Sequence, residues 1–390
     1  MCKAPFGAMS RLVAWLSHLT ALALLLVMSF RLGSNLLFWR WVRRQARGAH
    51  AQPRVSVLIP ARNEAATITS CVSSLLDQDY PDYEVIVLND ASSDNTAIQL
   101  DMLASQDARL QVIHSHDALP PGWNGKSYAC HRLAQRASGE WLLFTDADTV
   151  HTPQSIRQGM AQAVVLEADL VSAFPHQETH TWSEKVLVSF ILDFLPLVGL
   201  DLRAISRGKG SDSAGNGQYL LARASIYRRV GGHAAVHSET LDDFALARHY
   251  RLAGHKIALV DGKDWLRCRM YRSAGEAWQG FSRSMMHGLD NSTTRRHSWV
   301  GRLLFVWSYA SLFVNPFSFV LAGKRYLPAV LAIAWLGLLR WVATAYLRRP
   351  LLEVVTTPLA AWGVMLLGIT ALIRRRLGQT VKWKGRDVAR

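Results

Sequence analysis

The chain has 390 residues, more than one typical domain, and half of them are hydrophobic. Its 44 basic and 29 acidic residues give a net charge of +15, which raises the question of a nucleic-acid partner. The four cysteines (Cys2, Cys71, Cys130 and Cys268) lack metal-ligand spacing, and such scattered cysteines are typical of reduced cytosolic thiols.

The apolar residues are concentrated at the two ends of the chain. Residues 12–30 contain only His18 as an ionisable group and are long enough to cross a bilayer. Three further apolar stretches lie at about 303–322, 327–347 and 351–373. We therefore expect a soluble domain held between membrane segments.

The first apolar segment is either a cleaved signal peptide or an uncleaved anchor. It lacks a small-residue cleavage site and is followed by a cluster of arginines, which favours the anchor. The cluster consists of Arg40, Arg43, Arg44 and Arg47. Positive charge on this flank predicts that the following domain faces the cytoplasm, at the inner or plasma membrane.

Three full C-terminal spans would place the basic tail on the opposite side of the membrane from the soluble domain. We therefore expect residues 303–322, which contain Asn315 and Pro316, to re-enter the membrane or lie in its interface. Residues 186–200 are too short to span and are interrupted by Asp193 and Pro196, so we expect an interfacial or buried helix there.

Much of the excess positive charge flanks these apolar segments, as in Arg348-Arg349 and Arg374-Arg375-Arg376. Juxtamembrane arginines are better explained by membrane topology and anionic lipid than by nucleic acid. We expect no nucleic-acid partner. The sequence divides into an anchor with its basic flank (1–50), a soluble domain (51–300), membrane segments (301–373) and a basic cytosolic tail (374–390).

Strand and helix patterns alternate between residues 55 and 260, which predicts an α/β fold with a mainly parallel sheet. The expected strands and helices are, in chain order, strand 55–59, helix 65–77, strand 83–88, a helix ending near 105, strand 110–114, a helix ending near 137, strand 141–144, strand 170–173, strand 218–222, helix 242–253 and strand 256–260.

Polar clusters follow three of these strands. Asp146 and Asp148 come directly after the strand at 141–144, and two carboxylates at that spacing can converge on Mg²⁺ or Mn²⁺. Pro60–Glu64 follows the first strand, and Asn89-Asp90 follows the second. Each cluster alone could simply cap a helix. Together at the carboxyl ends of parallel strands, they predict a nucleotide site.

These motifs carry a family resemblance. The runs Val-Ser-Val-Leu-Ile-Pro-Ala-Arg-Asn-Glu, Asn-Asp-Ala-Ser-Ser-Asp-Asn-Thr and Asp-Ala-Asp resemble the family 2 glycosyltransferases of the GT-A fold. The resemblance covers about residues 55–290. It implies that Pro60, Glu64 and Asp90 hold the uridine of a UDP-sugar. It also implies that Asp146 and Asp148 bind nucleotide and a divalent metal.

Lys126, in Gly-Lys-Ser-Tyr-Ala, matches a family position near the donor diphosphate, and a lysine at a helix start suits phosphate. Asp242 and Asp243 open a helix, where acids also complement the helix dipole. The resemblance implies that Asp243 is the catalytic base and that Asp242 supports the site.

The loop Gly215-Asn216-Gly217 resembles the acceptor-side loop of the family, and Gly231-Gly232-His233 resembles the turn before the catalytic acid. We expect His233 and His237 to be structural.

Polymer-forming family members carry Gln-x-x-Arg-Trp after the base. This chain has Gln279-Gly280-Phe281-Ser282-Arg283 instead, which favours transfer of a single sugar. Arg283 could contact the diphosphate or be a basic interfacial residue.

Pro120-Pro121-Gly122-Trp123-x-Gly125-Lys126 and the tail Val381-Lys382-Trp383-Lys384-Gly385-Arg386 resemble a bacterial subgroup with carotenoid- and hopanoid-associated glycosyltransferases. The resemblance implies an inverting, metal-dependent enzyme that moves one sugar, from UDP-glucose, to an isoprenoid lipid such as a carotenoid. Hopanoid, polyprenyl phosphate and glycerolipid acceptors stay open, as does a non-catalytic membrane scaffold with the same fold. The sequence fixes neither the sugar, the choice of Mg²⁺ or Mn²⁺, the number of spans nor the oligomeric state.

Overall fold

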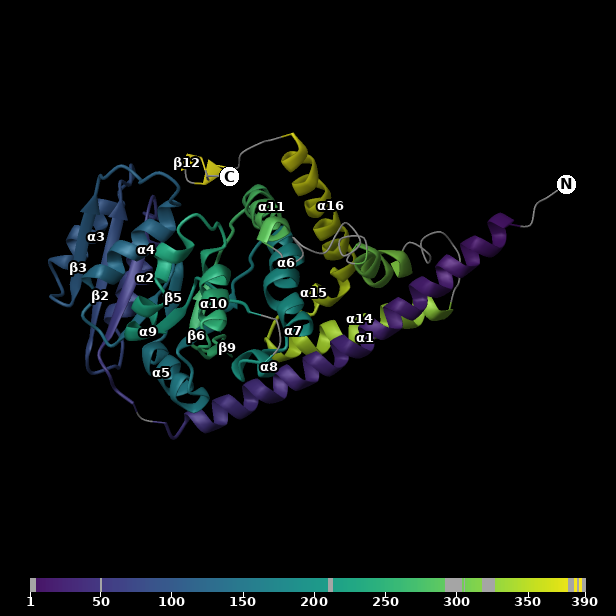
Figure 1. The fold of residues 1–390 in the computed structure, drawn as a ribbon, viewed down its shortest axis with the longest axis horizontal. Helices are drawn as coiled ribbons and strands as arrows, with labels where there is room; N and C mark the ends of the chain where they lie inside the picture. Colours follow the sequence, from purple (N-terminus) through teal and green to yellow (C-terminus); the bar gives the residue numbers. More distant parts are fainter. Residues whose placement is uncertain are drawn as a thin grey trace. The chain divides into compact units, whose positions relative to one another are not determined.

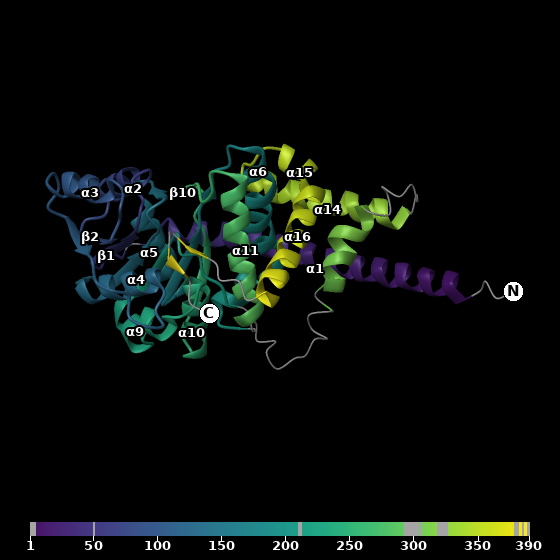
Figure 2. The same ribbon diagram turned by 90° about the horizontal axis from the view of Figure 1, so that it is seen from above.

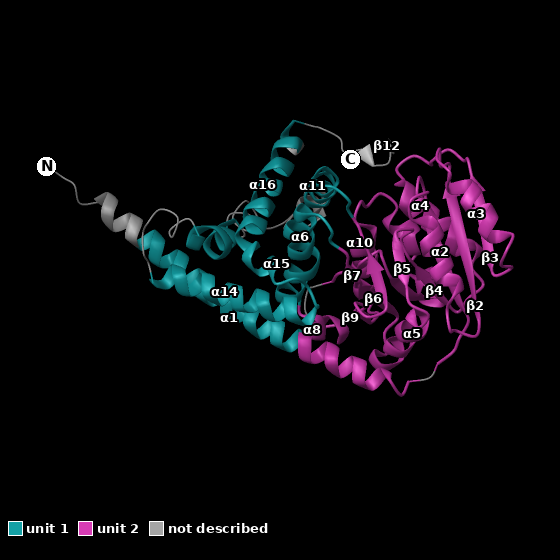
Figure 3. Cartoon of the chain, turned by 180° about the vertical axis from the view of Figure 1, so that it is seen from behind, with its two compact units in different colours: residues 1–35, 179–200, 271–378 teal, residues 36–178, 201–270, 379–390 magenta. Residues whose placement is uncertain are grey.

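The computed structural model describes residues 5–49, 51–209, 213–291, 304, 306–317, 327–377, 382–383 and 386–387. The chain forms two compact units (Figure 3). Unit 1 contains residues 1–35, 179–200 and 271–378, and unit 2 contains residues 36–178, 201–270 and 379–390. Each unit is built from segments that are distant in sequence, so neither unit corresponds to one continuous stretch of chain.

Unit 2 is organised around a seven-stranded sheet with the order β3-β2-β1-β4-β8-β6-β9 (Figure 1). Strand β8 is antiparallel to both of its neighbours, and the other pairings are parallel. This arrangement confirms the predicted α/β class with a mainly parallel sheet. The strands are β1 (Val55–Ala61), β2 (Tyr83–Asp90), β3 (Leu110–Ser115), β4 (Trp141–Phe144), β6 (Leu170–Phe174), β8 (Leu220–Arg223) and β9 (Ile257–Asp261).

Helices cover both faces of this sheet. Alternate residues of a strand point to opposite faces, and the central strands are apolar on both. Helices α2 (Ile68–Leu76) and α3 (Thr96–Ala104) lie on one side of β1 and β2, and α4 (Gly125–Arg136) lies on the other (Figure 2). Helix α5 (Ser155–Leu166) packs on the same core as α2.

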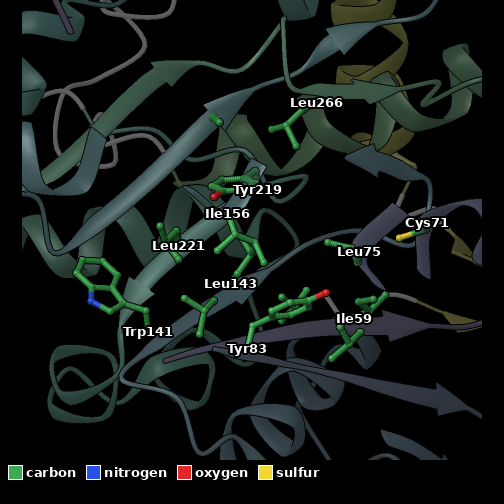
Figure 4. Packing of buried hydrophobic residues seen from close by; sticks show 14 of the residues in the cluster. Ile59, Cys71, Leu75, Tyr83, Trp141, Leu143, Ile156, Tyr219, Leu221 and Leu266 are labelled. Atoms are coloured by element: carbon green, nitrogen blue, oxygen red, sulfur yellow. The ribbon is translucent and has the colours of Figure 1, made fainter. Parts of the chain in front are cut away.

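The core between the sheet and α2 is closely packed (Figure 4). Ile59, Leu75, Leu143 and Ile156 meet there with their side chains inaccessible to solvent. Burying each such side chain contributes about 1.5–3 kcal/mol. This packing fixes the strand ends from which the polar loops emerge.

A small second sheet, absent from the sequence-based prediction, lies beside the first. It has the order β5-β10-β7 and consists of β5 (Thr149–His151), β10 (Leu266–Cys268) and β7 (His176–Gln177). Strand β5 begins directly after Asp148, so this sheet holds the far end of the loop that carries the two aspartates.

Helix α1 (Pro5–Ala46) is longer than the apolar segment predicted from sequence, and Arg40, Arg43 and Arg44 lie inside it. Its last turns belong to unit 2 and cover the edge strand β9. The Trp39 indole donates to the Leu259 carbonyl (3.0 Å), and Arg43 pairs with Asp261 (2.5 Å). Covering an exposed edge strand in this way blocks pairing with another chain.

Three helices among the described residues are long and apolar enough to cross a membrane: Leu12–Ala46, Leu327–Tyr346 and Thr357–Arg374. The apolar stretch 186–200 forms a helical segment that is largely buried within unit 1, with Phe190 and Phe194 inaccessible to solvent. This is the buried alternative of the sequence-based expectation. The predicted interfacial stretch 303–322 lies partly outside the described residues.

Unit 1 contains a buried ionic cluster. Arg340, in helix α14 (Leu327–Tyr346), and Arg349 both pair with Glu353, at 3.4 and 3.3 Å, and Arg349 also contacts Asp193 at 3.3 Å. The Glu353 side chain is 1% exposed. The carboxylate therefore compensates two buried guanidinium groups at once.

Because removing one partner of a buried pair strands the other charge, Glu353→Ala is expected to destabilise unit 1 by about 3–5 kcal/mol. Thermal unfolding in detergent would measure this. The matched control is Asp117→Ala, which breaks the exposed pair with Arg132 (2.7 Å) and should cost less than about 1 kcal/mol. Equal melting temperatures for the two variants would contradict the prediction.

Candidate active site

The predicted donor-binding residues meet at one edge of the large sheet. Strands β1, β2 and β4 run parallel, with Pro60 opposite Leu88 and Phe144 opposite Leu58. Asp90 ends β2, and Asp146 follows β4 by two residues. The carboxyl edge of an open α/β sheet is where ligands bind, so the topology itself creates this site.

The loops after β1 and β2 are tied together. Asn63 adopts a left-handed conformation (φ 52°), and its side-chain oxygen accepts a hydrogen bond from the Ser93 amide (2.8 Å). Asp94 accepts from the Thr96 amide (3.0 Å) and from the Ala65 amide (3.1 Å). Asn63 and Asp94 are thus loop-closing residues, in keeping with the capping alternative weighed from the sequence.

Glu64 and Asp90 lie on these tied loops. Arg62 donates to the Asp90 carbonyl (2.6 Å), and the Glu64 amide donates to the Thr96 hydroxyl (2.9 Å). These hydrogen bonds fix the backbone at Glu64 and at Asp90, so the carboxylate side chains of both residues are anchored at the carboxyl edge of the sheet.

The loop with the two aspartates carries an unsatisfied carboxylate. Oδ1 of Asp148 is buried and has no hydrogen-bond partner among the residues that the structure describes. Burial, followed by the negative charges of Asp146 and Glu64, raises the pKa of Asp148 to about 7. A cation would relieve both the desolvation and the repulsion, so these carboxylates fit a hard divalent ion.

A set of buried polar contacts, not foreseen from the sequence, holds this loop. The Thr145 hydroxyl donates to the Gln218 carbonyl (2.8 Å) and lies 3.0 Å from Nε2 of His151. Nδ1 of His151 lies 3.0 Å from the Ser155 hydroxyl. Burial lowers the pKa of His151 to about 3, so its ring is neutral at physiological pH. The sequence feature that could have identified these contacts is the presence of Thr145, His151 and Ser155 within an otherwise apolar pattern.

Lys126 lies in the first turn of α4. The Asn124 side chain caps this helix by accepting from the Ser127 amide (2.7 Å). Nζ of Lys126 contacts Oδ1 of Asp146 at 2.5 Å. Burial opposes the ammonium form, but Asp146, Asp242 and Asp243 outweigh it and raise the pKa of Lys126 well above its ordinary value. A permanent positive charge therefore faces the aspartate loop.

Asn124 also connects the loop before Lys126 to the segment before the acidic pair. Its backbone N–H donates to the His237 carbonyl (2.8 Å), and Nδ2 of its side chain donates to the Glu239 carbonyl (2.6 Å). The ring of Trp123 packs against that of His237 (5.3 Å between centroids). These contacts give His237 a packing role. They also fix the lysine loop relative to the start of α10.

Asp242 and Asp243 occupy the first turn of α10 (Asp242–Leu252) and have different surroundings. Asp242 is buried and lines a cavity with Lys126 and Asp146. Asp243 is half-buried, and its two oxygens accept from the Gly217 amide and the Phe244 amide, both at 2.8 Å. Burial and the charge of Asp242 raise the pKa of Asp243 to about 7.

The loop Gly215-Asn216-Gly217, predicted to lie on the acceptor side, packs against Asp243. The Asn216 amide donates to the Ser172 hydroxyl (2.8 Å), which anchors the loop on β6. A Cβ atom at Gly215 would lie 2.5 Å from the Asp243 carbonyl oxygen, so only glycine fits there. Arg283 belongs to unit 1, and its contact with a diphosphate stays a prediction.

Gly217, which sequence reasoning did not select individually, lies at the centre of the site. A Cβ atom built there would be 2.8 Å from Nζ of Lys126 and 3.6 Å from both Oδ2 of Asp146 and Oδ2 of Asp243. The lysine and both carboxylates thus surround one point. The groups around this point are thus a cation, a carboxylate predicted to bind metal and a candidate base.

Gly217→Ala should therefore push the Lys126 ammonium away from Asp146. We expect kcat/KM to fall by about 10- to 100-fold, because small displacements of positioned groups cost this much. Steady-state kinetics with circular dichroism would measure it. Gly48→Ala, at a glycine with open space around it and, like Gly217, without a left-handed backbone, controls for the loss of a glycine elsewhere in unit 2. A loss of activity equal to that in the control would contradict a local effect.

Residues 56–228 match the model of glycosyl transferase family 2. A Staphylococcus aureus (strain USA300) protein named 4,4'-diaponeurosporenoate glycosyltransferase is 23% identical over 382 residues, covering 96% of this chain and 98% of the relative. Its counterpart from strain MRSA252 is 24% identical over 302 residues, 76% of each chain.

Among solved structures, the mannosyltransferase PcManGT from Pyrobaculum calidifontis, in complex with GDP-Man and Mn²⁺, superimposes with a TM-score of 0.51 at 18% identity. The alignment covers 91% of this chain and 99% of that one. At this identity the likeness is one of fold, and it confirms the predicted fold class.

Proposed function

We propose that this chain, whose residues 56–228 match the model of glycosyl transferase family 2, transfers one sugar from a UDP-sugar to an isoprenoid lipid. The observation that carries the proposal is the convergence of Lys126, Asp146 and Asp243 around Gly217. A diphosphate, a divalent cation and an acceptor oxygen are the groups that such a set of side chains can serve.

For the donor, Pro60, Glu64 and Asp90 are the residues we assign to the uridine, because their loops emerge together at the sheet edge. Asp146 and Asp148 would hold Mg²⁺ or Mn²⁺. When bound, the ion would neutralise charge that develops on the departing nucleoside diphosphate. The ammonium of Lys126 supplies a second positive charge at the same place, and it is held there by Asp146.

For the acceptor, Asp243 is the group that removes the proton. Its carboxylate is held by two backbone amides, which fix its position without consuming all of its acceptor capacity. Attack from the base side, opposite the departing diphosphate, inverts the configuration at the anomeric carbon. Asp242, buried behind it, sustains the negative field that makes Asp243 a stronger base.

The lipid class of the acceptor rests on two supports. The relatives that align over nearly the whole chain carry a carotenoid-derived substrate in their names. In addition, three helices of this chain are candidate membrane spans, which suits a substrate that resides in the bilayer. We infer a multi-pass protein of the inner or plasma membrane with unit 2 on the cytoplasmic side, because Arg40, Arg44 and Arg47 follow the apolar segment 12–30. Glucose is the sugar we propose.

The first test is UDP release by the purified full-length protein in lipid, with UDP-glucose, Mn²⁺ or EDTA, and either hydroxylated carotenoid or total lipid extract. Release that requires both metal and lipid supports the proposal, and mass analysis of the lipid product identifies the acceptor. Tight UDP binding without release from any nucleotide sugar would instead support a non-catalytic scaffold. UDP-galactose and UDP-N-acetylglucosamine serve as donor controls.

A further inference from the structure

Three buried side chains from three different elements face one another at the cavity that Lys126 lines. They are Cys130 in α4, His233 in the 3-10 helix η2 (Gly232–Val236) and Asp242 at the start of α10. One potential ligand atom of each lies within 4.8 Å of the others. Nε2 of His233 is 3.7 Å from Oδ2 of Asp242. All three line the same cavity as Lys126.

The His233 ring is held in one orientation. Its Nδ1 lies 2.7 Å from the Tyr227 hydroxyl, and its backbone amide donates to the same hydroxyl at 3.0 Å. The ring also packs edge-on against Phe144 (4.8 Å between centroids). With Nδ1 occupied, Nε2 is the atom directed at Asp242. An outer hydrogen bond on the second ring nitrogen is the usual support of a metal-binding histidine.

The chemistry of this group differs from that of the aspartate loop. A thiol, an imidazole and one carboxylate form a sulfur–nitrogen–oxygen set, which suits zinc and similar ions and not Mg²⁺. The aspartate loop offers carboxylate oxygens, the ligands of hard cations. Lys126, the cation that lines this cavity, is paired with Asp146 at 2.5 Å, and the carboxylates of Asp242 and Asp243 lie close to it. Excess negative charge is therefore left for a second ion.

We propose that Cys130, His233 and Asp242 form a site for a thiophilic divalent cation of the zinc type, and that its occupation inhibits the enzyme. On binding, the Cys130 thiol gives its proton to the solvent and its sulfur becomes a ligand. Solvent water completes the coordination. Asp242 is then committed to the ion and no longer supports Asp243. The binding stands by itself, whereas the inhibition rests on the proposed function.

The geometry requires only a small closure. Bonds of about 2.0–2.3 Å from zinc to oxygen, nitrogen and sulfur imply separations between ligand atoms of roughly 3.3–3.8 Å. For a nitrogen–oxygen pair the expected separation is about 3.3–3.5 Å, so Nε2 of His233 and Oδ2 of Asp242, at 3.7 Å, need to approach by only a few tenths of an ångström. Sγ of Cys130 lies within 4.8 Å of both ligand atoms, and rotation about χ1 can bring it closer.

The binding test uses Co²⁺, which reports thiolate ligation by a near-ultraviolet charge-transfer band. The full-length protein in detergent, without nucleotide, should develop the band, and Zn²⁺ should displace it. Cys130→Ser and Cys130→Ala should both abolish it. Cys268→Ser is the matched control, because Cys268 is a buried thiol that accepts from Gln218 (2.8 Å) in unit 2. A band that survives loss of Cys130, or that vanishes in Cys268→Ser, overturns the site.

The activity test measures the rate of sugar transfer at increasing Zn²⁺ concentration and saturating Mn²⁺. The rate of each variant is divided by the rate of the same variant without zinc. Half inhibition of Cys130→Ser should require a Zn²⁺ concentration at least about 10-fold higher than that of the wild type. Equal sensitivity of wild type and variant would overturn the inhibitory role. If no transferase activity is found at all, the cobalt spectrum still decides whether the site exists, so failure of the proposed function and failure of this inference are distinguishable.

Discussion

Asp243→Asn is expected to lower kcat by about 10²- to 10⁴-fold while leaving UDP affinity within about 2-fold. The amide cannot accept a proton from the acceptor, but it keeps one acceptor oxygen for the amide of Gly217 or Phe244. At most one backbone hydrogen bond is lost, so the donor side of the site should stay intact. Single-turnover sugar transfer and calorimetric UDP binding would measure the two quantities separately.

Asp243 also sets the pH dependence of sugar transfer. Burial and the neighbouring charge of Asp242 raise the pKa of Asp243 to about 7 from an ordinary value of 3.8. Transfer should therefore decline as pH falls below about 7. The stability contribution of this residue is largest at low pH and is lost as pH rises through 7, because the folded state retains the proton longer than the unfolded state. Asp243→Asn should then melt at a higher temperature than wild type at pH 8.

The variant also separates two classes of acceptor. A hydroxyl must lose its proton during attack and needs the base, whereas a carboxylate is already ionised at neutral pH. Near-normal kcat on a hydroxylated lipid would refute the assignment of Asp243 as base. A large loss on the hydroxylated lipid together with a small loss on a lipid carboxylate would confirm the base and identify the acceptor chemistry it serves.

The large sheet was predictable because its strands are continuous apolar runs ended by turn residues. Strand β1 contains the run Val-Leu-Ile before Pro60, β2 contains Val-Ile-Val-Leu before Asn89, and β4 is Trp-Leu-Leu-Phe, two residues before Asp146. Such runs are the pattern of a strand buried on both faces. Parallel pairing then requires that Pro60, Asp90 and Asp146 emerge at the same edge. The donor side of the site thus follows from local pattern plus one topological rule.

The second sheet and the centre of the site could not be predicted, because they depend on contacts between distant segments of the chain. Strand β7 has two residues and β10 has three, too few for a period-two pattern to be recognised. The importance of Gly217 arises because Lys126 and Asp243, 91 positions earlier and 26 later, approach it in space. The Cys130, His233 and Asp242 group lacks metal-ligand spacing for the same reason. Sequence periodicity carries information on single elements, and these features belong to packed pairs and triples of elements.

Asp148→Ala is the second large effect we expect, with the metal-dependent part of UDP binding lost and affinity reduced by about 10- to 100-fold. In the wild type, EDTA should weaken UDP binding, and in the variant EDTA should change nothing. Unchanged affinity would remove Asp148 from the donor site. Asp107→Ala, which breaks the pair with Arg109 (2.6 Å) before the start of β3, serves as a carboxylate control at the other end of the strands.

Although Asp148→Ala should weaken UDP binding, it should raise the stability of the metal-free protein. Asp148 carries a buried oxygen without a hydrogen-bond partner and lies close to the charges of Asp146 and Glu64, so its carboxylate destabilises the metal-free fold at neutral pH. The metal-free variant should melt above the metal-free wild type, whereas Mn²⁺ with UDP should stabilise only the wild type. A residue that costs stability until a cation arrives is explained by ligand binding, because packing alone would favour its removal.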